Sequence, residues 1–336
     1  MRFGLALPHY DFSSPDGGPV SWERLGAWAR RAEDLGFDSV WVSDHFFLTL
    51  SRYGGGPDVY GSAEPLTTLA ALSVVTERVR LGSLVLCAGF RHPGLLAKSA
   101  TTIDLLSGGR LDLGLGAGWY EDEYRAFGYD FGTIGQRFEV LEESMEVLAL
   151  LFGQEEPVTW EGRHFRLEGA FNHPRPEQKP RPPLWLGGKG GPRLLRLVAR
   201  RADGWNTVWA WTPEDYAARA RALDEACERE GRDPDTVRRS VGLYALVGEN
   251  RGDLEARFRA LEQWTPGRAL EGADLDEWGR DKLVGTVGQV VERLAAFARE
   301  GVEEMIVSAA SLPFAVYDES MVNLLADAVL PAARDL

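Results

Sequence analysis

The segment Leu184–Asn206 holds the residues whose types and spacing point most directly to chemistry. A short apolar run, Leu184–Leu186, leads into the glycine-rich turn Gly187–Gly191, and Pro192 then opens a predicted helix. Glycines let backbone N–H groups approach a ligand closely, and the N-terminal end of a helix attracts anions. The turn is therefore predicted to bind a phosphate group through Gly187, Gly188, Lys189, Gly190 and Gly191, with Lys189 adding positive charge. The alternative is an ordinary flexible turn, because neither GxGxxG nor GxxxxGK[ST] is present.

A second pair of candidate residues is Asp44 and His45, within WVSDHFF at the end of a predicted strand. A histidine beside a carboxylate can be held in one tautomer and titrate near neutral pH, which suits a proton donor or acceptor. Asp44 and His45 are thus predicted catalytic residues, with Asp44 stabilising the charged form of His45. The alternative is a structural pair in which Asp44 caps the following loop. Arg91 and His92 precede Pro93 at a helix start, and either could cap that helix or reach a phosphate.

Other kinds of site are excluded by what the strand ends lack. No group of acids and histidines there could hold a metal, and no serine nucleophile elbow is present. Leu113–Gly118 (LGLGAG) follows a strand but lacks the acidic residue about 20 positions on that dinucleotide binding requires. Its glycines instead suit a ligand ring that lies against the backbone. The strand ends together predict a flat, phosphorylated cofactor that carries most of the chemistry.

The elements that position these residues alternate between strand and helix along the whole chain. The predicted strands are Arg2–Pro8, Ser39–Ser43, Arg80–Leu86, Leu111–Leu115, Leu184–Leu186, Trp205–Val208, Ser240–Val247 and Glu304–Ser308. They are short and apolar, as expected of parallel strands that are buried on both faces. Such strands close most economically as a (β/α)8 TIM barrel, and a doubly wound open sheet is the alternative.

Two segments interrupt the alternation, at about 153–183 and 250–284. The first contains a predicted hairpin, Val158–Trp160 against His164–Leu167, and a proline-rich run. The second is polar, and an aromatic loop, Trp119–Phe131, follows the fourth strand. Since neither segment has an apolar core of its own, residues 1–336 are predicted to form one barrel domain with two insertions.

Composition limits the partners of the protein. Its 336 residues are 44% hydrophobic and carry a formal net charge of −14, which argues against nucleic acid or an anionic membrane as a partner. Only two cysteines are present, Cys87 and Cys227, which indicates a reducing compartment and predicts a cytoplasmic protein. No apolar run approaches the roughly 18 residues of a membrane helix. A small-molecule substrate is expected, and the apolar helices allow a homodimer.

Several motifs together resemble the bacterial-luciferase-like oxidoreductases, over nearly the whole chain. They are DSVWVSDHFF, VRLGSLVLCAGFRHP, LSGGRLDLGLGAGWYEDEYRAFG, QRFEVLEE, EGRHFRLEG and PPLWLGGKGGPRLLRLVARRADGWN. Within that family the chain is most similar to the branch that uses the deazaflavin coenzyme F420. The resemblance implies a TIM-type barrel with the cofactor at the C-terminal mouth.

The resemblance also implies roles for individual residues. The cofactor phosphate would lie on Gly187–Gly191, and Asp44 and His45 would face the deazaflavin ring. A non-prolyl cis peptide would join Leu84 and Val85 behind the central ring. Contacts to the ring edge would come from Ala117, Gly118 and Trp119, and Asn206 at the end of the sixth strand completes the predicted cofactor site.

One departure from the family pattern concerns the substrate. Sugar-phosphate dehydrogenases of this branch carry a glutamate after the glycine turn, where this chain has Trp119. An apolar or aromatic substrate is therefore predicted, with hydride transfer to or from F420 and His45 as the proton partner. The alternatives are an FMN-dependent monooxygenase that uses molecular oxygen, a non-catalytic cofactor-binding protein, and a metal-free barrel aldolase or isomerase that grips a substrate phosphate.

Overall fold

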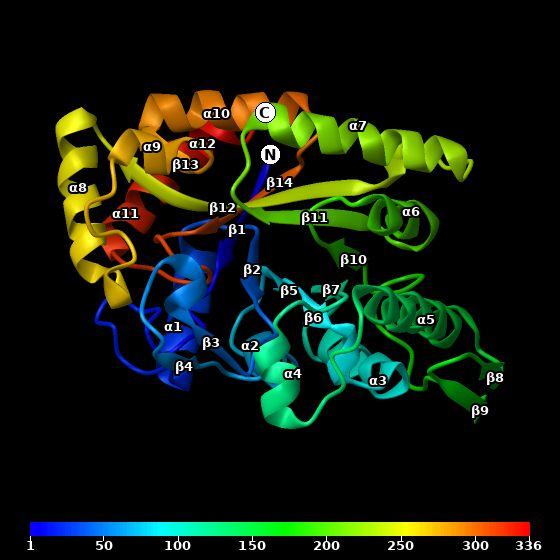
Figure 1. Ribbon diagram of the computed structural model, residues 1–336. Helices are drawn as coiled ribbons and strands as arrows, with labels where there is room; N and C mark the ends of the chain where they lie inside the picture. The colour runs from blue at the N-terminus through cyan, green and yellow to red at the C-terminus, as the bar shows by residue number, and fades with distance from the viewer.

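Eight parallel strands close into a barrel in the computed structural model, which describes residues 1–336 (Figure 1). Hydrogen bonds join them in the order β10-β11-β12-β14-β1-β2-β5-β7, and β7 pairs with β10 to complete the ring. This closing pair, with Leu113 opposite Leu184, confirms the (β/α)8 barrel and rules out the open sheet. The barrel strands are β1 (Arg2–Ala6), β2 (Ser39–Val42), β5 (Arg80–Ser83), β7 (Leu111–Gly116), β10 (Leu184–Gly187), β11 (Gly204–Trp209), β12 (Arg238–Gly248) and β14 (Glu304–Ser308).

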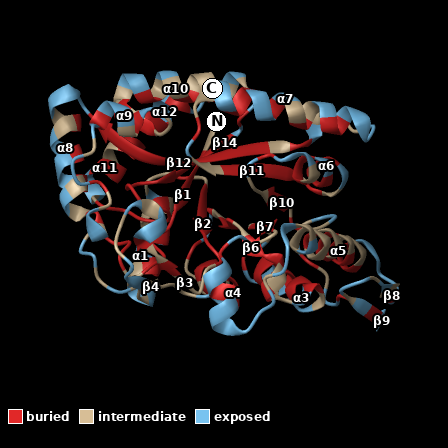
Figure 2. Cartoon of the chain, viewed as in Figure 1, coloured by how far each residue is buried: buried red, intermediate tan, exposed pale blue.

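Helices surround the barrel, and the buried strands lie at the centre of the molecule with exposed residues on the outer helices (Figure 2). Several begin at side-chain caps that the sequence supplies: Ser21 accepts a hydrogen bond from the N–H of Arg24, and Thr133 and Gln136 form a reciprocal capping box. The helices are α1 (Trp22–Asp34), α2 (Pro65–Ser73), α3 (Pro93–Leu106), α4 (Glu121–Phe127), α5 (Ile134–Gly153), α6 (Pro192–Arg201), α7 (Pro213–Arg229), α8 (Arg251–Trp264), α9 (Leu275–Gly279), α10 (Val287–Arg299), α11 (Glu319–Leu324) and α12 (Leu330–Ala333).

The middle of the barrel is filled by two indole rings. Trp41 on β2 and Trp185 on β10 are fully buried and meet edge to face, with ring centroids 6.2 Å apart. Glycines on the neighbouring strands make room for them. A Cβ atom at Gly82 would lie 2.2 Å from the Trp41 ring, and one at Gly204 would lie 2.3 Å from the Trp185 ring. The two tryptophans therefore separate the N-terminal end of the barrel from its mouth.

The structure corrects the predicted elements at four places. The third strand breaks after Ser83 and resumes as the short β6 (Leu86–Cys87). The predicted hairpin is present, as β8 (Val158–Glu161) and β9 (Arg166–Ala170), but its second strand begins two residues later. The expected aromatic loop contains α4, and a second hairpin, β3 (Phe47–Thr49) and β4 (Val59–Gly61), was not predicted.

The polar segment 250–284 is more ordered than its composition suggested. It forms α8, α9 and the strand β13 (Leu283–Thr286), which extends the sheet beside β12. Leu254, Phe258 and Leu261 of α8 are buried, because they repeat at intervals of three and four residues along one helix face. This segment therefore joins the apolar core instead of lying over it.

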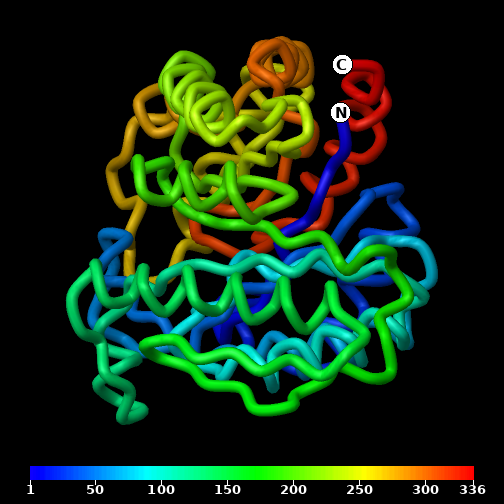
Figure 3. Tube along the Cα trace, turned by 90° about the vertical axis from the view of Figure 1, so that its right-hand side faces the viewer, coloured from blue at the N-terminus to red at the C-terminus, as the bar shows by residue number.

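The two ends of the chain lie side by side at the N-terminal end of the barrel (Figure 3). The amino group of Met1 donates hydrogen bonds to the carbonyl oxygens of Arg334, at 2.7 Å, and Leu336, at 2.8 Å. None of the helices combines the length and apolar character that crossing a bilayer would require.

Candidate active site

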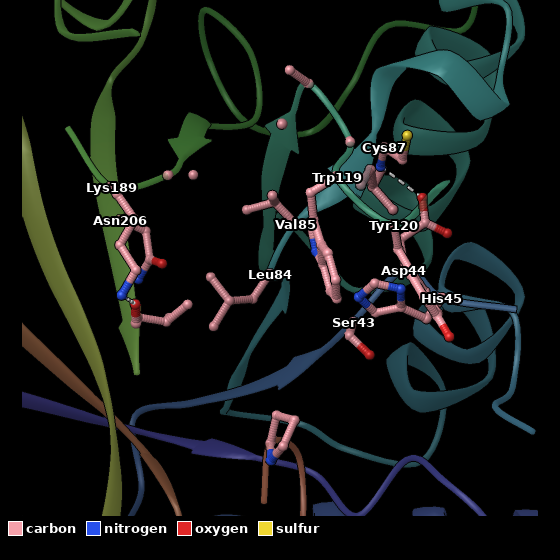
Figure 4. Close-up of a pocket in the computed structure, with 18 of the residues that line it drawn as sticks. Ser43, Asp44, His45, Leu84, Val85, Cys87, Trp119, Tyr120, Lys189 and Asn206 are labelled. Carbon is pink, nitrogen blue, oxygen red and sulfur yellow. Dashed lines mark hydrogen bonds between the residues drawn. The ribbon is translucent and has the colours of Figure 1, made fainter. Parts of the chain in front are cut away.

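A cavity of about 840 Å³ opens at the C-terminal mouth of the barrel (Figure 4). Loops that follow the barrel strands supply its walls. All the site residues predicted from the sequence, except Gly190, line it. They are Asp44, His45, Leu84, Val85, Ala117, Gly118, Trp119, Gly187, Gly188, Lys189, Gly191 and Asn206. The barrel thus brings together residues that are up to 162 positions apart in the chain, as Asp44 and Asn206 are.

One wall is the glycine-rich turn between β10 and α6. Gly188 has φ of 153°, which favours glycine, and its N–H donates to the carbonyl of Asn206 at 3.0 Å. The N–H groups of Gly190 and Gly191 have no acceptor within the protein, and they lie at the start of α6. Free N–H groups at the positive end of a helix fit a phosphate.

Lys189 also lies on this wall, but its side chain turns along it. Its Nζ atom donates a hydrogen bond to the carbonyl oxygen of Val208 and lies 5.0 Å from the centroid of the Trp211 ring. Burial lowers the pKa of Lys189. The side chain of Asn206 is buried beside it and donates to Ser240 Oγ at 2.8 Å.

The middle of the cavity wall is formed by Leu84 and Val85, and the peptide bond between them is cis, as predicted. A second non-prolyl cis bond, Val208–Trp209, was not predicted. The methyl groups of Val85 fill the space beside Gly187, where a Cβ atom would come within 2.7 Å of them. Figure 4 shows Leu84 and Val85 between Lys189 and Asn206 on one side and Trp119 and His45 on the other.

On that other side, the carboxylate of Asp44 makes no hydrogen bond to His45, contrary to the prediction. Its carboxylate accepts from the N–H of Cys87 at 2.7 Å and from Nη2 of Arg91 at 2.9 Å. Arg91 also donates to Glu64 at 2.6 Å, so it ties the loop after β2 to the start of α2. A buried carboxylate needs such partners because burial without them is costly. Asp44 therefore fixes the loop that carries His45, and the expectation that it orients the imidazole directly is wrong.

Glu123 of α4 takes the place expected for Asp44. Its Oε2 atom lies 2.7 Å from Nδ1 of His45, and its side chain is only 2% exposed. Oε1 accepts from the backbone N–H groups of Phe46 and Phe47, which locks the carboxylate in position. Because a carboxylate accepts hydrogen bonds, the proton of neutral His45 lies on Nδ1. Nε2 has no partner within the protein, so the neutral ring can accept a proton there and the protonated ring can donate one.

Sequence reasoning missed Glu123 although a pattern was available. The acidic run Glu121-Asp122-Glu123 lies within the predicted aromatic loop Trp119–Phe131, and no role was predicted for it. Glu123 follows Tyr120 by three residues, which places it on the same face if the segment is helical. Of the two residues left open, Arg91 binds Asp44, and His92 caps α3 by accepting from the N–H of Gly94 at 3.1 Å.

Aromatic side chains close the remaining walls. Trp119 meets the His45 ring edge to face, with centroids 5.4 Å apart. Trp209 stacks on Tyr244 at 5.3 Å and meets Phe314 at 5.4 Å. No sequence pattern marked Tyr244 or Phe314, since Phe314 comes from an irregular loop after the last barrel strand. Tyr244 and Phe314 are buried and keep water from their part of the cavity, whereas Trp119 is 41% exposed, and all of these rings suit planar, apolar ligands.

Two polar groups interrupt this apolar lining near His45. The hydroxyl of Tyr10 and Oγ of Ser43 share a hydrogen bond of 2.6 Å. Burial raises the pKa of Tyr10, so its hydroxyl keeps its proton. Cys87 is also protonated, because burial raises the pKa of its thiol to about 12, and it is therefore a poor nucleophile.

Comparisons with known proteins agree with this geometry. The sequence profile of the family described as luciferase-like monooxygenase matches residues 1–304. An F420-dependent glucose-6-phosphate dehydrogenase of Microbacterium testaceum (strain StLB037) is 35% identical over 239 residues, which cover 70% of this chain and 66% of that protein. The chain thus spans slightly less than two thirds of that relative.

Two further proteins extend the comparison. A phthiodiolone/phenolphthiodiolone dimycocerosates ketoreductase of Mycobacterium bovis (strain BCG / Pasteur 1173P2) is 31% identical over 76% of this chain and 68% of its own length. The solved structure of an F420-dependent secondary alcohol dehydrogenase in complex with an F420-acetone adduct has the same fold, with a TM-score of 0.79, 21% identity and 99% coverage of both chains. Since the family profile covers most of the sequence, the resemblance is confirmed, and the chain belongs to the luciferase-like monooxygenase family.

Proposed function

We propose that this protein is an F420-dependent oxidoreductase that transfers a hydride between the deazaflavin and a small organic substrate of apolar or aromatic character. The observation that carries the proposal is one cavity with two different ends. Free N–H groups at the start of α6 form one end, and the His45–Glu123 pair forms the other. F420-dependent enzymes among the relatives and neighbours favour this cofactor.

The residues present fit such a cofactor. Gly187–Gly191 would hold its phosphate, and Leu84, Val85 and the segment Ala117–Trp119 would contact its ring system. Asn206 would complete the wall between these two parts. When bound, the deazaflavin supplies or accepts the hydride. The protein supplies position and a dry environment, which together account for much of the rate of such reactions.

His45 is the proposed proton partner of the substrate. Glu123 holds Nδ1, so Nε2 can donate a proton to a substrate oxygen that gains a hydride at its carbon, or accept one in the opposite direction. Glu123 also fixes the orientation of the ring and keeps a proton on Nδ1 in both directions. The carboxylate of Glu123 binds the imidazole of His45. Glu123 therefore does not replace the glutamate that sugar-phosphate dehydrogenases of this branch carry at the position of Trp119.

The second candidate function is an FMN-dependent monooxygenase. The description of the family favours it, and the same glycine turn would accept the phosphate of FMN. Deazaflavin is nearly inert to oxygen, so turnover would consume oxygen only if the protein is the FMN-dependent monooxygenase. The proposed setting is a cytoplasmic enzyme that acts on a small molecule, in line with the two unpaired and buried cysteines.

The deciding experiment is a parallel titration of the purified protein with F420 and with FMN, followed by thermal shift and calorimetry. We expect F420 to bind at least ten times more tightly than FMN and to raise the melting temperature. Reduced F420 should then be oxidised by an aromatic aldehyde or ketone without oxygen consumption. Tighter binding of FMN, with oxygen uptake, would favour the monooxygenase instead, and tight binding without any turnover would indicate a cofactor-binding protein.

A further inference from the structure

One charged side chain that lines the cavity, Arg52, is exposed and has no oxygen partner in the protein. It makes no hydrogen bond, and no carboxylate oxygen lies within 4.0 Å of its guanidinium group, in contrast to every other charged group around it. The others are paired as Asp44 with Arg91, Glu123 with His45, Arg193 with Glu142, and Lys189 with the carbonyl of Val208.

Arg52 stands at the His45 end of the cavity. It belongs to a short 3-10 helix, Leu50–Tyr53, between β3 and β4. Its guanidinium carbon lies 4.5 Å from the centroid of the Trp119 ring, and the same ring contacts His45. Lys189 lies on the opposite side of the cavity from Trp119 and His45 (Figure 4). A group held by Arg52 would therefore lie close to the proton partner and away from the phosphate turn.

Arg52 differs from the other arginines that stack on aromatic rings, because they are half-buried and Arg52 is exposed. Four other arginines lie over aromatic rings in this protein, and each also has an oxygen partner. These pairs are Arg31 with Asn323, Arg137 with the carbonyl of Gly118, Arg193 with Glu142, and Arg238 with Asp112. Arg52 stacks on the Trp119 ring but has no oxygen acceptor in the protein. A guanidinium stacked on an indole keeps its N–H edge available, and this edge matches a carboxylate in a bidentate arrangement.

We propose that the substrate carries a carboxylate that Arg52 binds, so that the protein acts on small aromatic oxo acids or the corresponding hydroxy acids. This inference rests on the proposed function, which it makes more specific. In the reducing direction, the carbonyl carbon gains a hydride from the reduced deazaflavin, and the carbonyl oxygen gains a proton from His45. The product is a hydroxy acid, the deazaflavin leaves oxidised by two electrons, and the carboxylate is unchanged.

The first test measures binding without turnover. Calorimetry would compare benzoate with benzamide, a neutral molecule of nearly the same shape, in the wild type and in Arg52→Gln, Arg52→Lys and Arg221→Gln. Arg221 is a matched control, because it is an exposed, unpaired arginine of α7 that does not line the cavity. We expect benzoate to bind at least ten times more tightly than benzamide to the wild type and to Arg221→Gln. Arg52→Gln should abolish this preference, and Arg52→Lys should restore part of it.

The second test uses turnover and separates this inference from the proposed function. With reduced F420, kcat/KM for 4-carboxybenzaldehyde should fall at least tenfold in Arg52→Gln, while kcat/KM for benzaldehyde should change less than twofold. Equal affinity of the wild type for benzoate and benzamide, including no measurable binding of either, would overturn the inference. An Arg52→Gln substitution that weakens F420 binding as much as benzoate binding would do the same, because Arg52 would then serve the cofactor. Failure of the wild type to bind F420 at all would instead overturn the proposed function.

Discussion

The two ends of the barrel interior use buried charge in opposite ways. At the N-terminal end, Arg80 pairs with Asp112, and Glu304 accepts a hydrogen bond from Ser39. Arg238 lies over Trp185 and completes a layer in which charges of both signs face each other. At the mouth, the His45–Glu123 pair leaves Nε2 without a partner. At this N-terminal end, the floor of the barrel, each charge faces one of opposite sign. The mouth instead keeps polar groups for a ligand: Nε2 of His45, the N–H groups of Gly190 and Gly191, and the guanidinium of Arg52.

The comparison explains why the two ends can differ so strongly in one barrel. Trp41 and Trp185 fill the layer between them, so a charge at the floor does not share the cavity of the mouth. In barrels of this kind the C-terminal face carries chemistry, and the N-terminal face carries stability. Substitutions at the mouth should therefore change turnover, and substitutions at the floor should change the free energy of unfolding.

The largest effect is expected from His45→Gln at the mouth. Loss of a positioned proton donor or acceptor typically lowers turnover by about 10²–10⁴-fold. We therefore expect kcat to fall within this range, while the dissociation constant of the cofactor stays within a few fold. The free energy of unfolding should change by less than about 1 kcal/mol, because a glutamine amide can still donate to Glu123, which also keeps the N–H groups of Phe46 and Phe47. A variant with nearly normal kcat at saturating cofactor would show that His45 only packs against the ligand.

At the floor, Asp112→Ala should reverse this pattern. Asp112 is 1% exposed, and its removal leaves Nε of Arg80 and the indole N–H of Trp185 without their acceptor. Breaking a buried ion pair at one partner lowers the free energy of unfolding by about 3–5 kcal/mol. Chemical denaturation would measure the loss, with Glu228→Ala on the exposed face of α7 as the control. If kcat per folded molecule fell more than about threefold, the tryptophan layer would not separate the two ends.

Buried groups at the two ends should also change the free energy of unfolding with pH in opposite directions. At the mouth, the group concerned is His9. It follows β1 and is fully buried, and burial lowers its pKa to about 4 from 6.5. The unfolded chain therefore binds a proton between pH 6.5 and 4 that the folded chain does not. Stability that is present above pH 6.5 should be lost as pH falls through this window, by up to about 3 kcal/mol.

His9→Gln tests this expectation. The variant should have a flatter dependence of unfolding free energy on pH between 6.5 and 4 than the wild type. The control, His173→Gln at an exposed position, should keep the wild-type slope. Equal slopes for the wild type and His9→Gln would mean that the imidazole accepts its proton without unfolding.

The mouth was far more predictable from the sequence than the floor. The eight barrel strands follow from short apolar runs, and the glycine turn and the His45 loop follow because they come directly after such runs. Glu123 was missed because its position depends on how α4 folds back over the loop after β2. Phe314 and Tyr244 reach the cavity through tertiary packing that leaves no local pattern.

The floor was not predicted for a different reason. Asp112 and Glu304 are single charged residues within apolar strands, and a lone charge at a strand start is normally exposed. Direct pairing of β5 with β7 brings Asp112 near Arg80, and closure of the ring brings it near Arg238. Sequence spacing carries no record of these contacts, because they depend on which strands are neighbours and on how the barrel closes.

The smallest expected effect concerns Glu304 at the floor, and it has the opposite sign to that of His9. Burial raises the pKa of Glu304 above its ordinary value of 4.5, although Arg2, at 3.6 Å, and Ser39 oppose the rise. The folded chain therefore holds a proton that the unfolded chain loses, so the wild type should lose stability as pH rises from 4.5 through the raised pKa. The glutamine of Glu304→Gln stays neutral at every pH. Denaturation of both proteins from pH 4.5 to 8 should therefore show the variant becoming more stable relative to the wild type as pH rises. Because Arg2 and Ser39 oppose the rise in the pKa of Glu304, we expect this change to be smaller than that of His9. If the difference in unfolding free energy stays constant, or the wild type becomes the more stable protein as pH rises, Glu304 is held ionised by Arg2 and Arg238. The floor would then consist of fully charged pairs.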